Sequence, residues 1–92
     1  MLRVELYDSV LKLEGRLTAA DAEHIHMLMT RSDTLPNLVV DLTEVTFVDS
    51  VGEAVLSYLG RLGAEFVADT AYSLDVCERL DLRLAQNGIS HI

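Results

Sequence analysis

The segment that most constrains the fold is the run from Val39 to Gly52, VVDLTEVTFVDSVG, a long apolar stretch that ends in Asp-Ser-Val-Gly. Its first part, Leu38 to Leu42, is apolar apart from Asp41, which predicts a central strand covered on both faces. The small polar residues at its end are typical of a helix N-terminus. The run therefore predicts a buried strand followed directly by a helix that displays Ser50 in its first turn.

Alternating and capping patterns predict the other elements. Thr18 followed by Asp21 marks a helix start, and apolar residues at helical spacing continue it through Met29. In chain order we expect a hairpin over 2–14 that turns at Asp8-Ser9, a helix that ends before Pro36, and the strand over 38–42. These are followed by a helix over 51–62 and a short strand over 65–68. The last two elements are a third helix with Leu74, Cys77 and Leu80 inward and a strand over 82–85. This ββαβαβαβ order predicts an α/β fold: a mostly parallel sheet covered by helices, with an antiparallel N-terminal hairpin.

Composition narrows the functional classes. A chain of 92 residues, half of them hydrophobic, is expected to form a single domain over 1–92 without a linker. No apolar stretch is long enough to span a membrane and the first residues are charged, so a cytoplasmic protein without membrane insertion is expected. A single cysteine, Cys77, excludes an internal disulfide. The net charge of −8 disfavours nucleic acid and favours protein partners, while the oligomeric state stays open.

The helix over 51–62 offers a candidate surface. At about 100° per residue, one face of this helix collects most of its apolar side chains and is expected to face the core. These side chains are Val51, Ala54, Val55, Tyr58, Leu59 and Leu62. Leu56 falls outside that face between Gly52 and Gly60, which predicts a ridge that a partner could approach closely. The alternative is that Leu56 packs within its own domain.

Ser50 has a structural interpretation beside a functional one. Ser50 and Glu53 have the spacing of a capping box, in which the serine hydroxyl accepts from the Glu53 N–H and the Glu53 carboxylate accepts from the Ser50 N–H. On spacing alone, the motif is as expected for a helix cap.

Several residues of this region lie in the order of a known signature: Asp41-Leu42-Thr43, Val45, Phe47, Asp49-Ser50 and Gly52. In this the chain resembles STAS domains, the family of the anti-sigma factor antagonists, and the likeness extends over most of its length. In such antagonists the serine that matches Ser50 is phosphorylated by a partner kinase that also binds a sigma factor, and a metal-dependent phosphatase reverses it. The resemblance implies a non-enzymatic signalling switch in bacterial transcription, with Asp49 orienting the hydroxyl or the partner and Gly52 leaving room beside it.

One residue departs from the family pattern, and the family also includes proteins with a different role. The residue after the glycine is usually apolar in the family, whereas here it is Glu53, which adds negative charge next to Ser50. Other STAS proteins are fixed subunits, so the alternative is a small subunit bound to the ATPase of a lipid-trafficking ABC transporter. That role needs no serine chemistry and would use the ridge of Gly52, Leu56 and Gly60.

Enzymatic interpretations have little support in the sequence. His24 and His26 lie two positions apart, about 200° around a helix, so they are not placed to chelate one metal ion. Cys77 is expected to be a buried small hydrophobe. Val48 stands where a nucleophile elbow requires glycine, and no phosphate-binding glycine motif is present. We therefore expect no catalytic residues, no metal and no cofactor.

Overall fold

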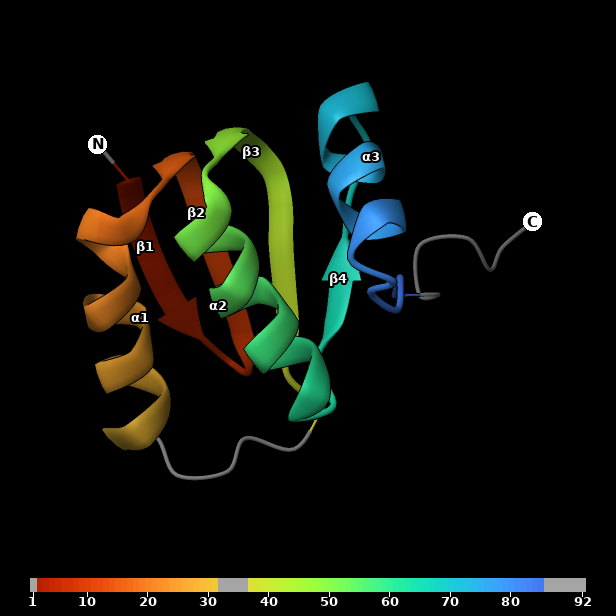
Figure 1. Cartoon of the computed structure of the whole chain (residues 1–92). Helices are drawn as coiled ribbons and strands as arrows, with labels where there is room; N and C mark the ends of the chain where they lie inside the picture. The colour runs from red at the N-terminus through yellow and green to blue at the C-terminus, as the bar shows by residue number, and fades with distance from the viewer. Residues whose placement is uncertain (1, 32–36, 86–92) are drawn as a thin grey trace.

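The computed structural model describes residues 2–31 and 37–85, and within these ranges four strands alternate with three helices (Figure 1). The elements are β1 (Leu2–Tyr7), β2 (Val10–Leu17), α1 (Ala19–Arg31), β3 (Val39–Val48), α2 (Ser50–Arg61), β4 (Glu65–Val67) and α3 (Ala71–Arg79). The strands form one mixed sheet in the order β1-β2-β3-β4. Only β1 and β2 are antiparallel; β2–β3 and β3–β4 are parallel. The predicted α/β fold with an N-terminal hairpin is confirmed.

The hairpin between β1 and β2 turns at the predicted residues. Tyr7 pairs with Val10, which leaves Asp8 and Ser9 as a two-residue loop. Both have positive φ, 50° and 65°. Two consecutive left-handed residues form the kind of tight turn whose twist matches that of the flanking strands. Asp and Ser in this loop therefore set the register of the first two strands.

The helices cover one face of the sheet (Figure 1). Along β2 and β3 the side chains on that face are buried, among them Leu11, Leu13, Val40 and Leu42, and they belong to one apolar core. Asp41 lies between Val40 and Leu42 and so points to the opposite face, where it is only partly buried. The prediction that this strand is covered on both faces is therefore wrong. An aspartate is tolerated here because water reaches that face and because the N–H and the hydroxyl of Thr43 donate to its Oδ1 at 2.9 and 2.8 Å.

The C-terminal part differs from the prediction in one element. Instead of a strand over 82–85, a single parallel bridge joins Leu84 to Phe66 of β4. The Phe66 N–H donates to the Arg83 carbonyl at 2.8 Å, and the Ala85 N–H donates to the Phe66 carbonyl at 2.8 Å. The order within the described residues is thus ββαβαβα, with this bridge at the edge of β4.

Three further predictions concern the helices: the inward face of α3, the end of α1 and the absence of a membrane-spanning segment. In α3 the buried residues are Ser73, Val76 and Cys77, whereas Leu74, predicted to face inward, is 41% exposed. α1 ends at Arg31, so the predicted stop before Pro36 falls outside the described residues. No helix in the described ranges is long and apolar enough to cross a bilayer.

Candidate functional site

The orientation of α2 differs from the prediction and changes the candidate surface. The buried residues of the helix are Gly52, Leu56 and Leu59. Leu56 is fully buried, whereas Val51, predicted to be in the core, is 43% exposed. The prediction of an exposed ridge is therefore wrong, and the alternative that Leu56 packs within its own domain is confirmed. Leu56 is not accessible to a partner in this conformation.

The glycines of α2 explain this orientation. A Cβ on Gly52 would lie 2.5 Å from the Leu17 carbonyl oxygen and 2.9 Å from a methyl group of Val48. A Cβ on Gly60 would lie 3.2 Å from a methyl group of Leu82. Only a residue without a side chain allows α2 to approach the end of β2 this closely. Gly52 therefore makes room for the sheet rather than for a partner at the serine.

Asp49 is the N-cap of α2, in place of the predicted Ser50. Its backbone is extended (φ −88°, ψ −177°), and its Oδ1 accepts from the Gly52 N–H at 2.8 Å. Its Oδ2 accepts from the Ala19 N–H at 3.0 Å, at the start of α1. One carboxylate thus caps two helices whose N-termini meet at the same edge of the sheet. The N–H of Gly52, followed by those of Ala19 and Val51, holds the pKa of Asp49 below its usual value.

Ser50 is consequently free of the capping role. It is the first residue of α2 and is exposed. Across residues 2–31 and 37–85 its hydroxyl forms no hydrogen bond, and the capping box predicted for Ser50 and Glu53 does not form. The hydroxyl is therefore presented to solvent at the N-terminus of a helix.

Glu53 is held by α3. Its Oε2 accepts from Arg79 at 2.8 Å, and the same guanidinium donates to Asp75 at 3.0 Å. The hydrogen bond to Glu53, followed by that to Asp75, raises the pKa of Arg79. The negative charge that the sequence places one turn from Ser50 is thus paired with a cation.

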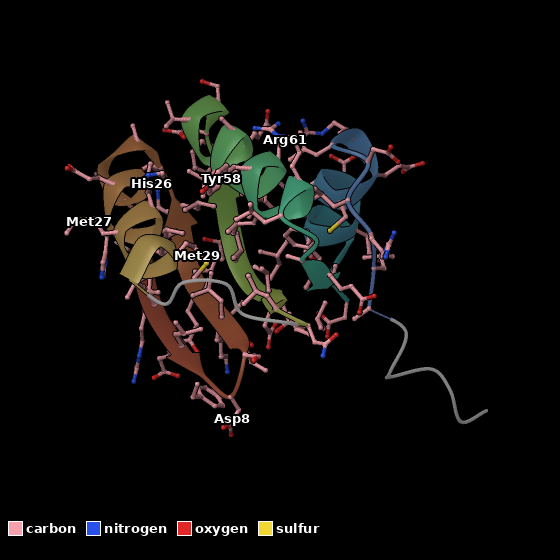
Figure 2. All side chains as sticks on the ribbon, turned by 90° about the horizontal axis from the view of Figure 1, so that it is seen from below. Asp8, His26, Met27, Met29, Tyr58 and Arg61 are labelled. Atoms are coloured by element: carbon pink, nitrogen blue, oxygen red, sulfur yellow. The ribbon has the colours of Figure 1, made fainter. Side chains whose placement is uncertain are left out.

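An apolar groove lies between α1 and α2 and continues from Ser50 through its neighbour Val51. Its volume is about 330 Å³. Its lining consists of Ala22, Glu23, Ile25, His26, Met29, Val51, Ala54, Val55 and Tyr58. Figure 2 shows His26 and Tyr58 directed toward each other across the two helices, with ring centroids 5.6 Å apart. The sequence pattern does not predict this groove, because it assigns the α2 residues of the groove to the core.

The histidines and the cysteine considered in the sequence do not form a catalytic or metal-binding cluster among the described residues. His26 packs on Tyr58, while His24 is exposed on α1. Cys77 is buried, and burial raises the pKa of its thiol, which opposes formation of a reactive thiolate. Among the described residues no group of three or more His, Cys, Asp or Glu side chains could hold a metal ion.

The site that emerges is the first turn of α2, where Asp49, Ser50, Gly52 and Glu53 are brought together. Asp49, Gly52 and Glu53 are engaged in packing and pairing, which leaves Ser50 as the polar side chain available for chemistry. Leu56 and Gly60 lie farther along the helix and belong to its inner side. Tyr72, which no sequence pattern indicated, accepts a 2.7 Å hydrogen bond from the Val48 N–H and closes the end of β3 beside the site.

No protein-family model matches the chain, and no curated protein sequence matches it. Among solved structures, the chain is similar to one described as "Crystal Structure Analysis of Mglu", with 23% sequence identity and a TM-score of 0.53. The match covers 74% of this chain and 19% of that one. This chain therefore shares its fold with about a fifth of a larger protein.

Proposed function

We propose that the chain is a protein-binding switch that resembles the STAS-type anti-sigma factor antagonists, with phosphorylation of Ser50 controlling its interaction with a partner kinase. The observation that carries the proposal is the division of roles at α2. Asp49 caps the helix, so the fold does not use the Ser50 hydroxyl, and that hydroxyl is exposed. A kinase can then reach the serine without unfolding the first turn.

The local electrostatics are compatible with a phosphate at this position. A phosphoserine adds about −1.5 to −2 charge, and the dipole and amides of a helix N-terminus favour a nearby anion. Asp49 opposes the phosphate, whereas Glu53 is paired with Arg79, a cation that it shares with Asp75. The added charge therefore falls on the surface of an intact domain.

The effect on binding would be larger than the effect on folding. A partner surface that covers a neutral hydroxyl would have to desolvate a dianion after phosphorylation, and an unpaired buried charge is strongly unfavourable. The groove that begins at Val51 gives such a partner an apolar surface beside the serine. Phosphorylation would thus release the partner while the fold persists.

The proposal is tested by comparing Ser50→Asp with Ala71→Asp in capture of partners from a lysate of the native cells. Ala71 is the first residue of α3 and is exposed, so its substitution places the same charge at an equivalent helix position. We expect Ser50→Asp to lose the captured kinase-like partner and Ala71→Asp to retain it, with equal melting temperatures. Equal capture by both variants would contradict the switch.

The second candidate is a constitutive adaptor, such as the small STAS subunit of a lipid-trafficking transporter ATPase. It is favoured by the apolar groove between α1 and α2, since exposed apolar surfaces of this kind mark interaction sites. The ridge of Gly52, Leu56 and Gly60 no longer supports it, because Leu56 is buried. In this case Ala54→Arg, in the groove, would abolish capture of an ATPase while Ser50→Asp would leave it unchanged.

A further inference from the structure

Among the described Lys and Arg side chains of this acidic chain, some have an interaction partner and others have none. Four of the Lys and Arg side chains have partners: Arg3, Lys12 and Arg79 form ion pairs with carboxylates, and Arg16 lies 4.7 Å above the ring of Phe47. Arg61 and Arg83 form neither an ion pair nor a hydrogen bond through their side chains within the described residues. In a chain of net charge −8, these two guanidinium groups remain available to an anion.

Both arginines line the same hollow. It lies between the C-terminal end of α2 and the segment over 80–83, and its volume is about 590 Å³. Ser57 and the Gly63 turn complete the side that α2 provides. Figure 2 shows Arg61 at the end of α2, on the side away from the sheet. This volume is within the usual range of small-molecule sites, about 300 to 1,000 Å³.

The wall that carries Arg83 is fixed by backbone hydrogen bonds. The Leu82 N–H donates to the Cys77 carbonyl at 2.9 Å, and the Arg83 carbonyl accepts from the Phe66 N–H at 2.8 Å. Gly60 allows Leu82 to pack against α2. The hollow is thus a product of the fold.

We propose that this hollow binds a small molecule through a doubly charged oxyanion, such as a phosphate monoester or a dicarboxylate. A guanidinium presents a planar fork of donors that matches these groups in a bidentate manner. Two guanidinium groups supply two positive charges and two sets of paired donors, and the Ser57 hydroxyl adds a further donor. The remaining volume accommodates the organic part of the molecule.

Two features oppose an anion here, and neither cancels the two cations. The first is the negative end of α2, where the carbonyls of residues 58–60 already accept from the N–H groups of Leu62, Gly63 and Ala64 at 3.0 to 3.2 Å. The second is Asp81, whose carboxylate belongs to the lining. Two arginines outnumber this one acidic residue in the lining, so Asp81 is a position at which affinity can be raised.

The test is a titration of the whole chain with inorganic phosphate, followed by amide chemical shifts in ¹H–¹⁵N NMR spectra at constant ionic strength. Malonate, titrated in parallel, distinguishes a phosphate group from a dicarboxylate. We expect saturable shifts confined to residues 57–64 and 80–83. The double variant Arg61→Gln/Arg83→Gln should weaken binding about tenfold or more, since each loses a charge-assisted hydrogen bond.

Two further variants make the outcome decisive. Arg3→Gln, on the strand at the opposite edge of the sheet, should bind like the unmodified chain. Asp81→Asn should tighten binding severalfold because it removes the opposing charge, and asparagine tolerates the positive φ of 56° at this position. Shifts that spread over all arginines, that persist in the double variant, or that do not strengthen in Asp81→Asn would overturn the proposal.

Discussion

Asp49 and Ser50 are neighbours with separate roles. The Asp49 carboxylate accepts hydrogen bonds from the first turns of both α1 and α2, whereas the Ser50 hydroxyl is directed to solvent. Ser50, which the sequence pattern suggests as the helix cap, is therefore not needed for capping in the fold. This difference between adjacent side chains is what allows a modification at Ser50 to change binding without changing the fold.

The two residues should respond differently to alanine. Asp49→Ala removes the cap of two helices, and we expect the melting temperature to fall by roughly 5 °C or more. Ser50→Ala removes no hydrogen bond within the described residues and should leave the melting temperature within about 1 °C. Thermal unfolding followed by circular dichroism measures both. A loss in Ser50→Ala as large as that in Asp49→Ala would mean that Ser50 is the cap.

The stabilisation by Asp49 should depend on pH with a defined sign. Backbone N–H groups, that of Gly52 first, lower the pKa of Asp49 in the folded state, so the unfolded state takes up the proton more readily. The contribution is therefore complete above the ordinary Asp pKa of about 4 and is lost as the pH falls through the lower folded-state pKa. The difference in melting temperature between the unmodified chain and Asp49→Asn should shrink between about pH 6 and pH 2. A difference that stays constant over this range would contradict the role of the carboxylate.

At the level of elements, α2 decides which surface is available. Gly52 allows the helix to approach the end of β2, and this turns Leu56 into the core and Val51 toward solvent. The groove between α1 and α2 exists because of that rotation, since Val51, Ala54 and Val55 line it. The packing of the glycine thus determines the surface next to the serine.

The rotation of α2 predicts unequal costs for two apolar substitutions. Leu56→Ala leaves a cavity in the core and should lower the free energy of unfolding by about 2 to 5 kcal/mol. Val51→Ala, on the exposed side, should cost less than about 1 kcal/mol. Urea denaturation of the two variants provides the comparison. If Val51→Ala were the more costly change, the helix would face the sheet as the sequence pattern predicted.

Local patterns in the sequence were enough to predict the hairpin, the start of α1 and most of the element order. They were not enough for the inner face of α2, because an apolar stripe counts large side chains and gives no weight to Gly52, the residue that permits the close approach. The capping of both helices by Asp49 could not be predicted either, because Asp49 and Ala19 are far apart in the sequence and meet only in the fold. The candidate serine could be located from the sequence, but its freedom from capping could not.

At the scale of the whole molecule, the two candidate sites lie at opposite ends of one helix. Ser50 begins α2 at the edge of the sheet where β2 and β3 end, and Arg61 closes the helix at the hollow. A helix of 12 residues is about 18 Å long, so a phosphate at one end and an oxyanion at the other act on separate surfaces. The opposite face of the sheet carries ion pairs such as Arg3–Glu5 and Lys12–Glu14. The chain therefore presents its candidate binding surfaces on the helical side.

The proposal that Ser50 is a regulated modification site can be tested by intact-mass spectrometry of the chain isolated from its native cells, with peptide mapping of any modified form. We expect a species heavier by the mass of one phosphate, about 80 Da, with the phosphate on Ser50. We expect this species to be absent from the fraction bound to the partner. A single unmodified mass in both free and bound fractions, or a phosphate mapped to another residue, would contradict it.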